Sequence, residues 1–247
     1  MRLPIEDVLV DAVFRRYAPA GRMAKQFARG KLRHDPIYFA LLRRGELPDV
    51  LRLLDLGCGQ GLLLALLLEA RELARAGRWP RDWPSPPSQL ALRGIERWPA
   101  EVRRARIALG SEAVIEDVDL REAALGESSC ITLIDVIHYL EPGAQGRLLA
   151  RIRGALLPGG VLIMRVGDAS ARFRAVLTRA ADHLGALVKG GRPGPLHQRS
   201  VAEWIAALES LGFSVRAEPM SAGTPFANAW LVARVDAVVL PYRSLGD

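Results

Sequence analysis

Acidic side chains stand at the ends of four short apolar segments in the first half of the chain. They are Asp55, Glu96, Asp117 and Asp135. If these segments are parallel strands, their carboxyl ends meet at one edge of a sheet and the carboxylates gather there. Carboxylates at such an edge can accept hydrogen bonds from an ammonium group, from ribose hydroxyls and from an adenine amino group. The spacing therefore predicts a site for a small ligand that contains a nucleoside and carries positive charge.

The segment after Asp55 decides which ligand is expected. A turn with glycine at every second position, residues 57–61, is followed at once by the apolar run 62–68. Such turns bind dinucleotides and other ligands alike. A dinucleotide would place its pyrophosphate at the start of the following helix, where Asp55 would repel it. S-adenosylmethionine has an ammonium group and a positively charged sulfonium instead, so the acid in front of the glycines favours it.

At these residues the chain resembles the class I S-adenosylmethionine-dependent methyltransferases. The likeness covers residues 51–166, and residues 53–61, 94–96, 116–118 and 134–136 are similar to four successive family motifs. It implies a Rossmann-like sheet of seven mainly parallel strands with an antiparallel last strand and helices on both faces. The predicted cofactor-binding residues are Asp55, Gly57, Cys58, Gly59, Gly61, Glu96, Arg97, Asp117, Val118, Asp135 and Val136. In this scheme Asp117 accepts from the adenine amino group, and the Val118 amide meets a ring nitrogen.

His138 is the predicted catalytic residue. It lies three residues beyond Asp135, on the expected loop after the fourth strand, where it faces the transferred methyl group by position. A base there assists transfer to a hydroxyl or an acid by about 10²–10⁴-fold. The alternative, that His138 and Tyr139 only form a wall of the pocket, remains open. His34 and His197 are further candidates, each with a packing or surface role as its alternative.

Substrate-binding residues are predicted on the segments that flank the core. In many members of the family a helix before the first strand closes over the cofactor, which implies that Tyr17, Lys31 or Arg33 lies near the methionine carboxylate or an acidic substrate. Tyr139 and His197 complete the predicted set. Residues 30–36 also resemble methyltransferases of bacterial aryl-polyene-type biosynthetic clusters. That likeness implies an aromatic or carrier-bound acceptor and an acyl carrier protein as partner.

The pattern of elements indicates one α/β domain. Apolar segments at 51–56, 90–95, 113–116, 131–137 and 160–166 alternate with helical patterns at 60–76, 99–109 and 143–156, which is typical of βαβ units. We predict a helical arm over 1–48, broken at residues 19–21, a cofactor-binding core over 49–166, a lid over 167–199, and a helix and strand hairpin over 200–247.

Several segments between these elements carry their own signals. The proline-rich segment 77–88 is expected to be a surface loop on the edge opposite the ligand. Helices are expected within 169–187 and a hinge at 190–195. Ser200 and Glu203 form a capping-box pattern, and strands are expected at 213–218 and 229–239 as a hairpin at the sheet edge.

Composition limits the function classes. The chain has 247 residues and a formal charge of +7. Its apolar runs are shorter than the roughly 20 residues that span a bilayer, and its first residues lack the pattern of a secretion signal. Two cysteines favour a reducing compartment, so we expect a cytoplasmic protein. No close set of metal ligands is expected.

Three functions remain open at this stage. Methyl transfer to an oxygen of a small molecule is the leading hypothesis. An RNA methyltransferase is favoured by the positive charge, although the residues after the fourth strand are not an Asn-Pro-Pro-Tyr-like tetrad and lysines are few, so a nucleic-acid partner is not expected. A non-catalytic S-adenosylmethionine-binding protein is the third. The basic arm, with seven cations and no acid between Phe14 and His34, is either a solvated face or an anion-binding face.

Overall fold

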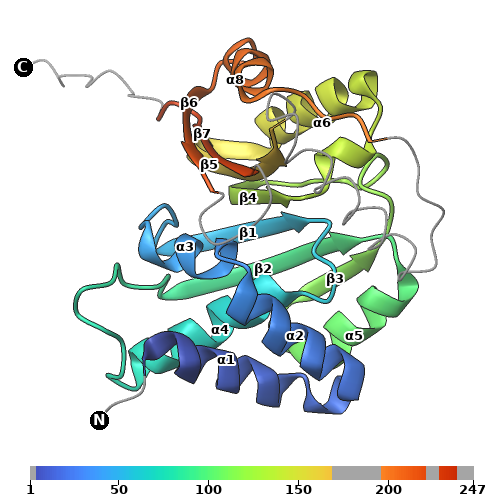
Figure 1. Ribbon diagram of the computed structural model, residues 1–247. Coiled ribbons are helices and arrows are strands. Elements are labelled where there is room, and N and C mark those ends of the chain that lie inside the picture. Colours follow the sequence, from blue (N-terminus) through green and yellow to red (C-terminus); the bar gives the residue numbers. More distant parts are fainter. Residues whose placement is uncertain (1–3, 169–195, 221–227, 238–247) are drawn as a thin grey trace, which may run out of the picture.

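One seven-stranded sheet organises the molecule. The computed structural model describes residues 4–168, 196–220 and 228–237, and the strand order is β3-β2-β1-β4-β5-β7-β6 (Figure 1). The strands are β1 (Val50–Leu56), β2 (Gln89–Glu96), β3 (Val114–Asp117), β4 (Ser128–Ile134), β5 (Leu156–Gly167), β6 (Ser214–Pro219) and β7 (Asn228–Arg234). The first five pair in parallel, and β7 is antiparallel to both β5 and β6. The predicted fold class is confirmed.

Helices cover both faces of this sheet. They are α1 (Ile5–Arg16), α2 (Arg22–His34), α3 (Ile37–Arg43), α4 (Leu62–Arg75), α5 (Pro99–Leu109), α6 (Pro142–Ala155) and α8 (Val201–Glu209), with short 3₁₀ turns η1 (Ala18–Ala20), η2 (Gly110–Glu112) and η3 (Ile137–Tyr139). One apolar cluster joins α1 to α5 with one face of the sheet, and a second joins α6 and α8 with the other face. The two layers lie below and above the central strands in Figure 1.

Strand β1 shows why the chain folds in this way. Leu51 and Leu53 belong to the first apolar cluster, and Leu54 and Leu56 belong to the second. A central parallel strand that is buried on both faces needs apolar side chains at nearly every position. The run Leu51–Leu56 supplies them at every position except Arg52, which is exposed, and Asp55, which is buried. Asp55 is therefore the residue that needs a functional explanation.

The helical arm contains the expected break. Helix α1 ends at Arg16, η1 follows, and Gly21 adopts φ +98° before α2 begins. Glycine reaches this region without the steric cost that a side chain carries. Helix α1 packs against both α2 and α4. The arm is therefore part of the helical layer on that face.

Several boundaries differ from the sequence-based expectation. Strand β4 ends at Ile134, three residues before the expected end, because Asp135 turns the backbone to φ +56° and η3 follows. Strand β5 already starts at Leu156, four residues early. In the terminal hairpin, β7 enters the sheet beside β5 and leaves β6 as the edge strand.

Other expectations are met or lie outside the described residues. The Ser200 hydroxyl accepts from the Glu203 amide at 3.3 Å, and the Glu203 carboxylate accepts from the Ser200 amide at 2.7 Å, which confirms the capping box. Residues 77–88 connect α4 to the start of β2 as an irregular segment, and Trp79 donates to the Pro84 carbonyl at 2.9 Å. The helices and hinge expected between residues 169 and 195 lie outside the described residues. None of the described helices is long and apolar enough to cross a membrane.

Candidate active site

Asp55 is a buried carboxyl group at the carboxyl end of β1. Its side chain accepts a 2.7 Å hydrogen bond from the Thr132 hydroxyl of the neighbouring strand β4, and only 5% of the residue is exposed. Burial, and to a smaller extent the charge of Glu96, raise the pKa of Asp55 to about 7 against the hydrogen bond from Thr132, which lowers it. In the described part of the chain no cation pairs with this group. Asp55 is therefore placed to receive a positively charged ligand.

The glycine turn is shaped by close packing on two sides and is open at its centre. A Cβ added at Gly57 would lie 2.4 Å from Val136, and one added at Gly61 would lie 2.6 Å from Leu109. Only glycine fits at these two positions. Gly59, at φ +55°, has no neighbouring atom within 4 Å of its hypothetical Cβ, so its backbone is open to a ligand. Cys58 packs its sulfur toward Gly94.

The Glu96 carboxylate connects the glycine turn after β1 to the turn that follows β2. One of its carboxylate oxygens accepts from the Gly59 amide at 2.9 Å, and the other accepts from the Arg97 and Trp98 amides at 2.8 and 2.9 Å. Each carboxylate oxygen has about two lone-pair positions. The oxygen bonded to Gly59 therefore retains capacity for a ribose hydroxyl, which is the role predicted for Glu96.

Two predicted cofactor-binding residues lie at the end of β3. Asp117 is exposed at the strand end, as expected for a group that meets an adenine amino group. The Val118 amide donates to the Glu96 carbonyl at 3.1 Å, so it is already used within the protein, and its contact with a ring nitrogen stays a prediction. Arg97 is exposed, stacks 4.7 Å from the Trp98 ring and lies 3.7 Å from Asp119.

Asp135 belongs to a buried chain of ion pairs. Arg165, near the end of β5, contacts both carboxylate oxygens of Asp135 and both of Asp35. Its Nε lies 2.8 Å from Asp135, and one of its terminal nitrogens lies 2.8 Å from Asp35. Lys31 contacts the Asp35 carboxylate at 2.8 Å. Burial opposes ionisation of Asp35, but the hydrogen bonds and charge of Arg165, followed by those of Lys31, lower its pKa to about 2. This chain ties the end of α2 to the ends of β4 and β5.

Sequence reasoning missed Arg165, Asp35 and a third residue, Tyr38. Tyr38 is buried, and its pKa is raised by burial and by the nearby charges of Asp35, Asp55 and Asp135, against that of Arg165. An arginine inside the apolar strand of residues 160–166 was a usable signal, because a buried arginine needs acidic partners. Tyr38 carried no comparable signal.

His138 lies buried on the turn after β4, and Tyr139 beside it is half exposed. The two rings are 4.4 Å apart. Burial lowers the pKa of His138, against the charge of Asp135, which raises it. The backbone amide of His197 donates to the His138 carbonyl at 2.8 Å, so the two predicted histidines do meet through their backbone.

Gln145, a fully buried residue of α6, holds this turn in place. Its amide nitrogen donates to the carbonyls of Leu140 at 3.0 Å and of His197 at 2.7 Å. Its oxygen accepts from Arg199 at 2.8 Å. The segment that carries His197 is thereby fastened to the turn that carries His138.

The remaining predicted residues lie on the arm. Tyr17 is fully buried and its hydroxyl donates to the Gln60 carbonyl at 2.6 Å, so this hydroxyl supports the glycine turn from inside the protein. Arg33 and His34 are exposed at the end of α2. Lys31 is engaged with Asp35, as described above. Substrate contacts of these residues remain predictions.

These residues fit S-adenosylmethionine. The buried carboxyl group of Asp55 has a raised pKa and lacks a cation within the described chain, which matches a ligand ammonium group. The open backbone at Gly59 allows close approach. Glu96 and Asp117 stand in order along the same edge, at the ends of β2 and β3. The donor set therefore agrees with the ligand that the sequence indicated.

Comparisons with known proteins show the family of the chain. The family profile described as a methyltransferase domain matches residues 23–218. A curated relative, carboxy-S-adenosyl-L-methionine synthase of Chromohalobacter salexigens, is 33% identical over 115 residues, which are 44% of this chain and 37% of that protein. The chain thus spans little more than a third of the curated relative it matches.

Solved structures show the same fold. An O-methyltransferase family protein from Burkholderia thailandensis has a TM-score of 0.59 at 17% identity, covering 87% of this chain and 59% of that one. Magnesium protoporphyrin IX methyltransferase from Synechocystis PCC 6803, solved with bound SAH, has a TM-score of 0.55 at 19% identity. The match covers 94% of this chain and 98% of that one. Because the family profile matches most of its length, the chain belongs to the methyltransferase domain family. It has the fold of the class I S-adenosylmethionine-dependent methyltransferases.

Proposed function

We propose that this protein transfers a methyl group from S-adenosylmethionine to an oxygen nucleophile of a small molecule. Suitable acceptors are hydroxyaryl compounds and carboxylic acids, free or bound to an acyl carrier protein. The observation that carries the proposal is the position of His138, buried on the turn after β4 next to the acidic edge. Because burial lowers its pKa, the imidazole is neutral at neutral pH and can accept a proton.

The residues of the site divide the work. Asp55 would hold the ammonium group, Glu96 the ribose hydroxyls and Asp117 the adenine amino group. The bound cofactor supplies a methyl group that is already activated by a positively charged sulfur. His138 would accept the hydroxyl proton of the acceptor while the bond from the acceptor oxygen to the methyl carbon forms and the bond from that carbon to sulfur breaks, which would leave S-adenosylhomocysteine. The protein mainly orients the partners and excludes water, which is enough for an in-line displacement.

The charges at this edge favour transfer of an uncharged methyl group. The curated relative is named for making a carboxylated form of the cofactor. Here Asp135 pairs with the buried Arg165, whereas Asp55, Glu96 and Asp117 form no ion pair within the described residues. A negatively charged substituent on the sulfur would be repelled by this balance. The two buried thiols suit a reducing compartment, so we place the reaction in the cytoplasm.

The test separates cofactor binding from acceptor chemistry. Calorimetry measures the binding of S-adenosylhomocysteine, and methyl transfer is screened with hydroxyaryl acids, free and carrier-bound. For the best acceptor, His138→Ala should lower kcat about 10²–10⁴-fold and leave cofactor affinity nearly unchanged. Ile107→Ala, at an exposed position of α5 that is not among the predicted site residues, is the control and should keep full turnover.

Two results would contradict the proposal. A fully active His138→Ala variant would assign His138 to the pocket wall instead of to base catalysis. Methyl transfer to nitrogen or carbon acceptors, with none to oxygen, would replace the proposed acceptor while leaving the cofactor site in place.

A further inference from the structure

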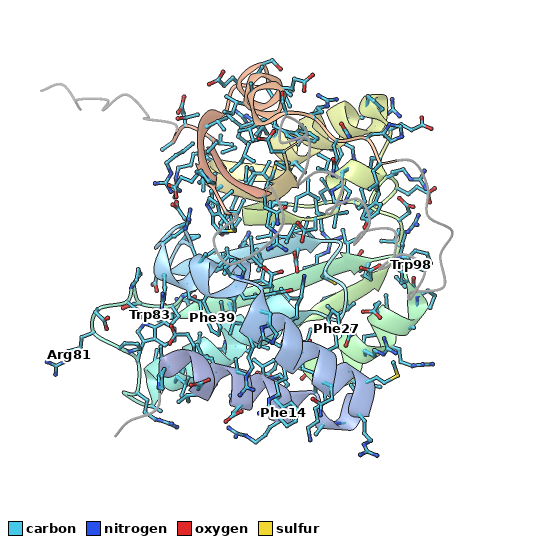
Figure 2. The ribbon with its side chains drawn as sticks, in the orientation of Figure 1. Phe14, Phe27, Phe39, Arg81, Trp83 and Trp98 are labelled. Carbon is cyan, nitrogen blue, oxygen red and sulfur yellow. The ribbon has the colours of Figure 1, made fainter. Side chains whose placement is uncertain are left out.

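Helix α2 has an unusual exposed face. Its small apolar residues Ala24, Ala28 and Leu32 are buried against the rest of the arm. The opposite face exposes Met23 at 77% and Phe27 at 45%. These two lie one helical turn apart, and Figure 2 labels Phe27 on this helix. They are among the few large apolar side chains that the described surface exposes.

Four cations lie along α2 on the other side of its exposed surface from this apolar pair. Arg22 and Arg33 are exposed, and Lys25 and Arg29 are half-buried over the ring of Phe14, at 4.2 and 5.1 Å. None of the four forms an ion pair within the described residues. Helix α2 contains no acid. From Arg22 to Arg33 the row extends about 16 Å at the α-helical rise.

We propose that this face of α2 binds an anionic lipid surface peripherally. The exposed surface of α2 combines unpaired cations with exposed Met and Phe side chains. A bilayer interface has phosphate groups at its outer level and acyl chains below them, so it offers a partner for each kind of side chain. The cations meet the phosphates, and Met23 and Phe27 enter the boundary. The buried apolar residues of α2 pack inside the protein and cannot insert into a membrane. Only Met23 and Phe27 are left to insert, so the contact with the lipid surface is shallow and reversible.

The charge of this surface supports a lipid as the occupant. The exposed charges of α2 have one sign, and such a surface needs no shaped pocket in its partner. A membrane surface offers a continuous plane of phosphates that such a row can meet at any position.

The experiment measures co-sedimentation of the full chain with vesicles. Phosphatidylglycerol vesicles should bind the protein at low salt, and phosphatidylcholine vesicles should not. Because each cation near an anionic surface contributes about 1 kcal/mol, equal to about fivefold in affinity, Arg22→Gln with Lys25→Gln should weaken binding about 25-fold. Met23→Ser with Phe27→Ser keeps all charges and should weaken binding at least about tenfold, because the apolar area is lost.

Matched controls and a competing polyanion complete the design. Ile107→Ser on α5 and Val114→Ser on β3 also remove exposed apolar side chains, and they should leave vesicle binding unchanged. Circular dichroism and melting temperature verify that each variant folds. A single-stranded RNA tested alongside should respond to the charge variant and not to the Met23 and Phe27 variant.

Three outcomes would overturn the proposal. The first is failure to bind phosphatidylglycerol vesicles at low salt. The second is vesicle binding that is unaffected by the Met23 and Phe27 variant. The third is equal weakening by the Ile107 and Val114 controls. RNA binding tighter than vesicle binding, with vesicle binding insensitive to the apolar residues, would assign the face to nucleic acid instead.

Discussion

Asp55 and Glu96 are two buried acids at one edge that the protein treats differently. Glu96 accepts hydrogen bonds from three backbone amides. Asp55 receives only the hydroxyl of Thr132 and has its pKa raised to about 7. A carboxyl group in this state gains most from a cationic ligand, because the positive charge of the ligand stabilises the ionised form that burial disfavours.

The raised pKa predicts pH-dependent cofactor binding. An ammonium group stabilises ionised Asp55, so binding below about pH 7 must release a proton. Affinity for S-adenosylhomocysteine should therefore rise about tenfold from pH 6 to pH 8, as the ionised fraction grows. Calorimetry at several pH values, in buffers of different ionisation enthalpy, measures both the affinity and the released proton.

Asp55→Asn serves as the control for this effect. The amide cannot ionise, so affinity should be low and flat between pH 6 and pH 8. A flat profile in the unmodified protein would show that the ligand ammonium group does not pair with Asp55.

At the scale of elements, Arg165 joins three parts of the chain. It lies in β5 and pairs with Asp35, after α2, and with Asp135, after β4. Asp135 sits in the left-handed region at φ +56°, a conformation that costs a non-glycine residue free energy. The ion pairs of Arg165 hold the turn at Asp135 against the end of the helical arm. They therefore fix the position at which η3, which carries His138, begins.

Removing Arg165 should therefore be costly. Arg165→Met leaves the carboxylates of Asp35 and Asp135 without their main partner, and the free energy of unfolding should fall by about 3–5 kcal/mol, as expected for breaking a buried ion pair from one side. Urea denaturation measures it. Arg216→Met is the comparison, since the Arg216 side chain is 55% exposed and Glu46 keeps Arg234 as partner. Its cost should stay below about 1 kcal/mol, and equal costs for both variants would contradict the argument.

At the scale of the whole molecule, the apolar layers on the two faces of the sheet bury both cysteines of the chain. Cys58 on the glycine turn and Cys130 on β4 both belong to the first apolar cluster. Both thiols are free and buried, and burial raises the pKa of each. Neither is available as a thiolate in the folded protein.

The two thiols should therefore report global unfolding. In native buffer at pH 8, a disulfide reagent that detects thiolates should react with both only as fast as the protein unfolds, because the thiolate forms slowly in an apolar site. Bound S-adenosylhomocysteine should slow the reaction further, since a ligand of the folded state lowers the unfolded population. Rapid reaction of one thiol in the folded protein would contradict this picture.

The sequence alone determined the features that depend on local pattern. The run Leu51–Leu56 with its single acid, the glycines of residues 57–61 and the capping box at Ser200 each follow from neighbouring residues, because strand burial, turn conformation and helix capping act over a few positions. The order of the acids along the chain was enough to predict the sheet edge and the ligand class.

Only the tertiary structure decided which polar groups are already used within the protein. Arg165 lies 130 residues from Asp35, Tyr17 lies 43 residues from the carbonyl of Gln60, and Gln145 lies 52 residues from that of His197. Such pairings depend on how helices pack against the sheet, and residue spacing does not encode them. The Val118 amide is the clearest case, because its bond to the Glu96 carbonyl exists only once β2 and β3 lie side by side.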